Sequence, residues 1–176
     1  GYQVAGDGFS IDGRLVFCCL ANDHFATGVN PFVPVAASFP LNRTQAQQDQ
    51  IRQEIQRLLD LLGLKTGAYN FDIRVDAAGR VFLMEVGPRN GGNFIPQVIR
   101  RATGADLIDW TIRAALGETL PAAGLAAATT GFWSYYAVHS DRAGRLVNIA
   151  IDPAVQKDNV VESHLSYAPG ARVPAF

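Results

Sequence analysis

The sequence has few of the features that mark disulfide-rich, membrane-spanning or nucleic-acid-binding proteins. Its only cysteines, Cys18 and Cys19, are adjacent and would point to opposite faces of a strand, which excludes a disulfide framework. The formal net charge is -1, so the strongly basic surface of a nucleic-acid binder is absent. Charged residues, Gly or Pro interrupt every apolar stretch before the roughly 20 residues that a spanning helix needs, and no signal peptide is recognisable. We therefore expect reduced cysteines, a cytoplasmic location, and neither membrane nor nucleic acid as a partner.

The sequence does have enough apolar residues for a core. Its 176 residues are 48% hydrophobic, which suits one compact domain or two small lobes. The chain begins with Gly1 rather than Met and opens at once into strand-like sequence. From this we expect a fragment of a longer protein.

Sequence patterns predict an α+β fold with mainly antiparallel strands. Apolar and β-branched runs predict strands at 2–4, 8–11, 14–21, 32–38, 68–75, 80–86, 131–138, 146–151 and 159–166. Helices are predicted at 44–62, at 93–102 with Asn93 as N-cap, and at 105–116. In the last of these the residues expected to face inward are Leu107, Ile108, Ile112, Ala115 and Leu116. We expect a polar loop at 22–31 and an edge strand at 32–38, because Pro34 cannot donate to a ladder. In that loop Asp23 and His24 could face a cleft, but a solvent-facing position is the favoured interpretation.

Two carboxylates stand out because each lies inside an otherwise apolar strand. Asp72 is flanked by Phe71 and Ile73, and Glu85 by Met84 and Val86. If the intervening turn pairs residue 75 with residue 80, Asp72 and Glu85 become diagonal neighbours on one face. Magnesium prefers oxygen ligands and often takes one or two carboxylates with substrate phosphates, so this pair predicts a metal site.

The alternative is that a nearby cation neutralises these carboxylates. Arg74 would lie on the same strand face as Asp72, and ion pairs across a strand face are common. In that case the pair would be structural.

A glycine-rich segment, Gly87-Pro88-Arg89-Asn90-Gly91-Gly92-Asn93, directly follows the Glu85 strand and precedes a predicted helix. Arg89 offers a planar fork of donors that suits phosphate or carboxylate. Gly91 and Gly92 allow close approach of the backbone, and the amides at the helix start favour an anion. Taken alone, such a segment is more often only a turn.

Together, the residues D-I-R-x(10)-E-V-G-P-R-N-G-G-N-F-I-P resemble the final signature of the ATP-grasp superfamily. The resemblance implies that Asp72 and Glu85 bind the metal at the ATP phosphates and that Arg89 is the catalytic, charge-stabilising residue. Asn90, Asn93 and Arg74 are then candidates for holding phosphate or substrate. The implied cofactors are ATP and Mg²⁺, with Mn²⁺ as an alternative metal. Many members have an Asn where this sequence has Gly87, so either Asn90, water or a reduced metal count must compensate.

The resemblance also predicts how the chain is organised. Residues 1–120 correspond to the C-terminal lobe of an ATP-grasp domain, a mainly antiparallel sheet with flanking helices. Residues 121–176 correspond to a small C-terminal β-rich region, which begins with an Ala-rich stretch expected to form a loop. The family's N-terminal lobe, which contributes a phosphate-binding lysine and the adenine pocket, is expected elsewhere in the polypeptide. This chain alone should therefore be almost inactive.

The implied function is an ATP-dependent ligase with a small-molecule carboxylate and an amine as substrates. ATP would convert the carboxylate to an acyl phosphate, which the amine or another nucleophile then attacks. Bicarbonate as the acid, and a homo-oligomer, are left open. The alternative is a non-catalytic ATP-grasp relative that serves as an anion-binding or protein-interaction module, and Gly87 in place of Asn is the feature that favours it.

Overall fold

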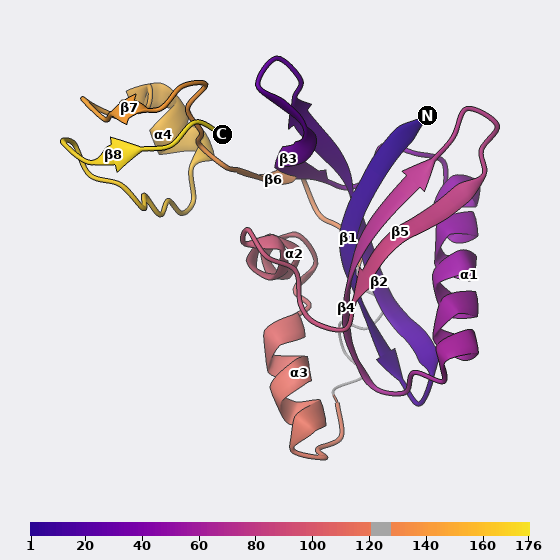
Figure 1. The fold of residues 1–176 in the computed structure, drawn as a ribbon. Helices are drawn as coiled ribbons and strands as arrows, with labels where there is room; N and C mark the ends of the chain where they lie inside the picture. The colour runs from indigo at the N-terminus through magenta and orange to yellow at the C-terminus, as the bar shows by residue number, and fades with distance from the viewer. Residues whose placement is uncertain (121–127) are drawn as a thin grey trace.

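The computed structural model describes residues 1–120 and 128–176, and a six-stranded antiparallel sheet forms its centre (Figure 1). The strand order is β5-β4-β1-β2-β3-β6. The strands are β1 (Tyr2–Ile11), β2 (Arg14–Ala26), β3 (Asn30–Phe39), β4 (Gly67–Val75), β5 (Val81–Gly87) and β6 (Trp133–Tyr136). Helix α1 (Gln45–Leu62) covers one face of the sheet, and helices α2 (Ile95–Thr103) and α3 (Leu107–Ala115) lie on the other. The α+β class with a mainly antiparallel sheet is confirmed.

Helix α1 forms where its capping residues and apolar stripe predict it. Thr44 and Gln47 make a capping box, and Gly63 ends the helix in the left-handed conformation. Ile51, Ile55 and Leu59 are buried against the sheet. Their burial joins the helix to the apolar cluster on the β4 face that contains Phe71 and Ile73, listed in full as Val4, Leu20, Leu41, Ile51, Ile55, Leu59, Tyr69, Phe71, Ile73 and Val75.

Helix α3 turns only part of the predicted stripe to the core. Leu107 is buried as predicted, and so is Trp110, but Ile108, Ile112 and Leu116 are exposed. The indole ring meets the rings of Phe9 and Phe17 edge-on, with centroids 5.7 and 5.6 Å apart. Two overlapping apolar stripes exist on this helix, and the one that contains the large aromatic ring buries more area.

The first three strands are longer than predicted. Strand β1 is continuous, and β2 runs on to Ala26, so the loop expected at 22–31 is wrong. Strand β3 pairs with both β2 and β6, and it is therefore not an edge strand as a whole. Pro34 lies opposite Phe25, next to register shifts in the β2–β3 ladder. An irregular ladder at that position tolerates a residue without an N–H.

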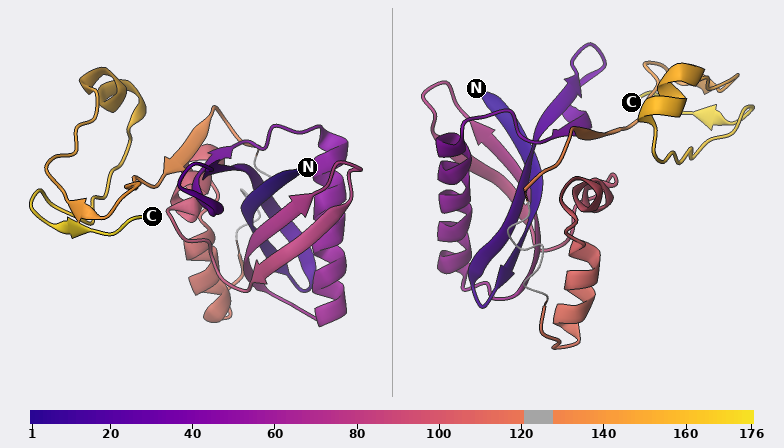
Figure 2. Two further views of the ribbon diagram at one scale, coloured as in Figure 1. Left: turned by 45° about the horizontal axis from the view of Figure 1, so that its top comes forward. Right: turned by 180° about the vertical axis from the view of Figure 1, so that it is seen from behind.

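The C-terminal region departs most from the prediction. The strands expected at 146–151 and 159–166 are wrong, since the described structure there contains only β7 (Gly144–Arg145), α4 (Pro153–Asn159) and β8 (Arg172–Val173). These elements stand away from the main sheet (Figure 2), so their apolar residues have no neighbouring sheet strand to pair with. By contrast, β6 joins the sheet of the preceding lobe. The expected boundary at 121 and most of the Ala-rich stretch lie outside the described residues.

None of the helices in the described ranges is both long and apolar enough to cross a membrane.

Candidate metal and phosphate site

The sheet face on the side of α2 and α3 has an apolar half and a polar half. In β4, Phe71 and Ile73 face the α1 side, and the alternate residues face the α2 and α3 side. Ala68 on that second side is buried with the residues of α2 and α3. Farther along the same face, Asn70, Asp72 and Arg74 extend beyond this core. The polar half of this face is the candidate site.

Asp72 and Glu85 lie directly opposite one another across the β4–β5 pair. The predicted diagonal arrangement is wrong, because Val75 pairs with Val81 and the register shifts by one residue next to Asp72. Ile73 pairs with Leu83, so Met84 is the extra residue of a β-bulge. Without the bulge, Glu85 would turn towards α1. The irregularity therefore brings the two carboxylates onto one face.

No described cation neutralises Asp72. Burial is the main cause that raises the pKa of Asp72, the nearby Gln3 amide opposes it, and the negative charge of Glu85 adds to it. Arg74 is exposed, and among the ion pairs of residues 1–120 and 128–176 none includes it. The alternative in which Arg74 pairs with these carboxylates is therefore not what the structure shows.

Asp23 adds a third carboxylate that sequence reasoning assigned to a solvent-facing loop. It lies on β2 opposite Ala37 of β3, and both of its oxygens are buried without a hydrogen-bond partner in the described structure. Burial, followed by the negative charge of Asp72, raises the pKa of Asp23 to about 7. The nearby Gln3 amide lowers the pKa of Asp23, although it is not in position to form a hydrogen bond with either oxygen. The pKa of Tyr135 is raised mainly by burial and secondly by the negative charge of Asp23. Residues 22–24 carry no strong strand signal of their own, and pairing with β3 is what extends β2 through Asp23.

The donor set fits a divalent cation held partly by substrate. Asp72 and Glu85 offer oxygen atoms from adjacent strands, and the buried oxygens of Asp23 lack a compensating charge nearby. Within the described ranges no three His, Cys, Asp or Glu side chains form a complete metal cage. Magnesium commonly uses one or two carboxylates and completes its shell with phosphates and water. A magnesium ion at this pair would therefore need phosphate and water to complete its shell.

Arg89 lies beside this pair, next to Gly87. One Arg89 terminal nitrogen, Nη2, is 4.0 Å from Glu85 Oε1, and the other, Nη1, donates to Asn70 Oδ1 at 3.2 Å and to the Asn90 carbonyl at 3.0 Å. A Cβ added at Gly87 would come within 3.4 Å of the Arg89 side chain. The Arg89 side chain would thus be in ordinary van der Waals contact with a Cβ at Gly87.

The remaining predicted residues of the glycine-rich segment take separate positions. The Asn90 amide donates to Thr111 Oγ1 of α3 at 3.1 Å, so it points towards that helix. Asn93 has a left-handed backbone with φ 49° and lowers the pKa of Tyr135 as a side-chain donor. The prediction that Asn93 caps α2 is wrong, because Phe94 is the N-cap and makes no side-chain cap bond. Pro96 in the first turn instead presets the helix start.

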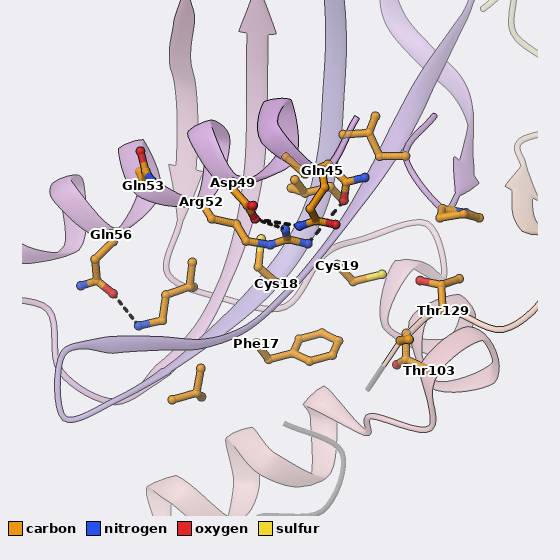
Figure 3. Close-up of a pocket in the computed structure, with 17 residues that line it drawn as sticks. Phe17, Cys18, Cys19, Gln45, Asp49, Arg52, Gln53, Gln56, Thr103 and Thr129 are labelled. Atoms are coloured by element: carbon orange, nitrogen blue, oxygen red, sulfur yellow. Dashed lines mark hydrogen bonds and ion pairs between the residues drawn. The ribbon is translucent and has the colours of Figure 1, made fainter. Parts of the chain in front are cut away.

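A separate groove of about 770 Å³ lies along β2 and α1 (Figure 3). Cys18, Cys19 and Arg52 line it, and the predicted metal and phosphate residues do not. Both cysteines are free thiols, as expected. Burial raises the pKa of Cys18 to about 12 and that of Cys19 to about 11. The groove therefore contains two thiols in a protonated, weakly nucleophilic state.

We predict slow alkylation of both thiols in the folded protein. The pKa of Cys19 lies about two units above an ordinary thiol, which lowers its thiolate fraction about a hundredfold at neutral pH. Treatment with iodoacetamide at pH 7, followed by peptide mass spectrometry, should show Cys18 and Cys19 labelled fully only after unfolding in urea. Equal labelling rates in the native and unfolded protein would contradict this expectation.

Known proteins resemble this chain more clearly in fold than in sequence. No protein-family model matches the chain. The uncharacterized protein y4rH of Sinorhizobium fredii is 34% identical over 143 residues, which span 81% of this chain and 29% of that protein. Carnosine synthase 1 of Gallus gallus is 30% identical over 106 residues, 60% of this chain and 11% of that protein. The chain thus spans less than a third of either relative.

Solved structures of ATP-grasp ligases match along the chain. Phosphoribosylglycinamide synthetase from Anaerococcus prevotii has a TM-score of 0.79 at 19% identity and covers 100% of this chain and 44% of its own. L-amino acid ligase from Bacillus licheniformis has a TM-score of 0.80 at 18% identity, with coverages of 100% and 45%. The biotin carboxylase domain of Hydrogenobacter thermophilus 2-oxoglutarate carboxylase, in complex with MgADP and bicarbonate, has a TM-score of 0.65 at 14% identity, with coverages of 98% and 38%.

These structures define the class of fold: the chain has the fold of an ATP-grasp lobe, as its motif predicts. In particular, it corresponds to somewhat under half of the matched synthetase and amino acid ligase chains.

Proposed function

We propose that this chain is the C-terminal ATP-grasp lobe of a ligase that binds Mg-ATP and activates a small carboxylate as an acyl phosphate for attack by an amine. The observation that carries the proposal is the direct opposition of Asp72 and Glu85, with Arg89 4.0 Å from Glu85. Two carboxylates and a guanidinium at one strand edge suit a phosphoryl group with its metal. The ATP-grasp fold supports the same assignment.

In this proposal Asp72 and Glu85 would hold Mg²⁺, or Mn²⁺, which would supply charge neutralisation at the ATP phosphates. Arg89 would bind the oxygens of the phosphoryl group as a carboxylate oxygen attacks the γ-phosphorus and ADP leaves. The same guanidinium would stabilise the acyl phosphate while the amine attacks its carbonyl carbon and phosphate departs. The protein's contribution is mainly positioning and charge neutralisation.

The polar residues around this pair would serve the substrates. Asn93 and Arg74 are our candidates for phosphate or substrate contacts. A phosphate contact from Asn90 would require its amide to leave Thr111. Asp23, with its unpartnered oxygens near Asp72, is a further candidate for a positively charged group.

An amine is the nucleophile that the named relatives favour. L-amino acid ligase, carnosine synthase 1 and phosphoribosylglycinamide synthetase carry names that refer to amino acids or an amide. The biotin carboxylase domain, whose structure contains bicarbonate, leaves carboxylation open as an alternative reaction. We propose that the rest of the polypeptide supplies the N-terminal lobe with the adenine pocket, so this chain alone would be almost inactive. Free cysteines are consistent with a cytoplasmic enzyme.

The second candidate function is a non-catalytic ATP-grasp relative that binds anions or a protein. Gly87 favours it, because the Asn ligand of many ATP-grasp members has no counterpart at this position. Such a protein would bind its partner without hydrolysing ATP in the presence of any acid and amine.

Calorimetric titration of ATP into the full-length protein, with and without magnesium, tests the proposal. We expect ATP affinity to fall at least about tenfold without the metal, because the two carboxylates would then face the phosphates unscreened. Phosphate release with pairs of amino acids should identify the substrates. Magnesium-independent binding together with no phosphate release from any pair would favour the non-catalytic relative.

A further inference from the structure

Asp7 is a fully buried carboxylate that no predicted role uses. It lies in the middle of β1 with 0% exposure, and Ser10 is the other fully buried polar residue reported for the described chain. Ser10 has an evident structural task, since its hydroxyl donates to the Lys65 carbonyl at 2.6 Å and contacts the Tyr69 hydroxyl at 3.1 Å. The contacts of Asp7 lead instead to the candidate site.

Two donors reach the Asp7 carboxylate from different elements. The Gly91 N–H donates to Oδ2 at 2.7 Å, and the Asn70 amide of β4 donates to Oδ1 at 2.9 Å. The side-chain oxygen of Asn70, Oδ1, in turn accepts a hydrogen bond from Arg89 Nη1 at 3.2 Å. A continuous chain of hydrogen bonds therefore runs from the glycine-rich segment through Asp7 and Asn70 back to Arg89.

The acceptor-only carboxylate gives this chain a direction. A guanidinium can only donate, so Asn70 must turn its oxygen to Arg89 and its NH₂ to Asp7. If residue 7 were Asn, its own NH₂ would have to face either the Gly91 N–H or the Asn70 NH₂. One contact in the chain would then be lost whichever way the two amides rotate.

Gly91 is adapted to the same contact. A Cβ at this position would lie 2.6 Å from Asp7 Oδ1, 3.0 Å from Oδ2 and 3.0 Å from Ile95 Cβ. The absence of a side chain thus lets the backbone reach the buried carboxylate.

The carboxylate is retained at a cost. Burial raises the pKa of Asp7 to about 6, although the hydrogen bonds from Gly91 and Asn70 and the charge of Arg89 lower it. Asp7 pairs with Cys19 of β2. Cys19 and the adjacent Cys18 are thiols and offer no positive charge to compensate the carboxylate. A neutral residue would be easier to bury here, so fold stability alone does not account for Asp7.

We propose that Asp7 is a positioning residue: it anchors the glycine-rich segment through Gly91 and, through Asn70, orients the Arg89 guanidinium beside Asp72 and Glu85. Its importance for catalysis rests on the proposed ligase function. The anchoring itself is a property of the fold that can be measured whether or not the protein is a ligase.

The test compares Asp7→Asn with Ser10→Ala in the full-length protein, because both substitutions alter a buried polar residue of β1. For Asp7→Asn we expect an unchanged or higher Tm, together with at least tenfold faster exchange of the Gly91 amide or loss of a fixed Arg89 side-chain NMR signal. In an active ligase, kcat should fall about 10- to 100-fold. Ser10→Ala should lower Tm and leave both signals and kcat within about twofold of wild type.

Gly91→Ala approaches the same contact from the other side. It should likewise speed exchange of the residue 91 amide or loosen the Arg89 side chain, and the double variant should be no worse in these signals than the more impaired single variant, because both substitutions act on the same chain of hydrogen bonds. Unchanged Gly91 exchange and Arg89 signals in Asp7→Asn would overturn the inference, whatever the activity. So would a fall in Tm like that of Ser10→Ala with kcat unaffected. Absence of ligase activity in the wild type would overturn the proposed function only, since the two NMR readouts would still decide the anchoring.

Discussion

Replacement of Glu85 by Gln in the full-length protein should reduce kcat by about a thousandfold or more. The amide keeps the size of the side chain but removes the charge that would face the metal and Arg89. Glu85 is 68% exposed, so the fold should be unaffected. Steady-state phosphate release and Mg-ATP calorimetry measure the effect, and both turnover and metal-dependent ATP affinity should fall.

Glu54→Gln is a matched control, because Glu54 is a partly exposed carboxylate on α1, on the far side of the sheet, and has only a 3.9 Å contact with Arg57. Its kcat should stay within about twofold of wild type, as expected for a surface ion pair of small energetic value. Asp72→Asn should resemble Glu85→Gln, and the double variant should lose little more than either single variant, since both remove the same interaction. Substantial turnover in Glu85→Gln would exclude the metal role.

Replacement of Arg89 by Lys should lower kcat about a hundredfold, even though the positive charge is retained. Lysine offers a compact point charge without the planar fork of donors, so it does not reproduce the geometry with which the guanidinium contacts Asn70, the Asn90 carbonyl and a phosphate oxygen. Arg89→Ala should be more severe, because the charge is lost as well. Rapid-quench measurement of acyl phosphate formation would place the defect in the chemical step.

Arg80→Lys provides the comparison within the same hairpin. Arg80 pairs with Asp76 at 2.7 Å in the β4–β5 turn and is 74% exposed, away from the carboxylate pair. We expect this variant to retain wild-type kinetics. If Arg89→Lys did the same, with kcat within threefold of wild type, Arg89 would have no specific role in charge stabilisation.

The local motif and the capped helix α1 could be predicted because their signals are contained in adjacent residues. Asp72, Glu85 and Arg89 lie next to one another in the structure, and their shared role at a metal stays a prediction. Their register could not be predicted, since a β-bulge depends on how both strands twist within the sheet. The same limit applies to Trp110, whose burial depends on Phe9 and Phe17 from distant strands.

Long-range pairing decides the structure both at Asp23, where a strand partner is present, and in the C-terminal region, where no strand partner is described. Asn22, Asp23 and His24 have weak strand propensity, yet pairing with β3 holds them in β2. Residues 146–151 and 159–166 have favourable apolar patterns but no described sheet partner, so they do not form strands. Propensity alone could not distinguish the two cases.

The bulge at Met84 also bears on how relatives of this protein can be recognised. Twelve residues separate Asp72 from Glu85 here, and one of them has no partner in the ladder. A homologue that lacked this residue would have a regular strand pair, and its two carboxylates would still face each other. The interval between the two acidic positions can therefore be one residue shorter without separating the carboxylates, and a search for relatives should allow both intervals.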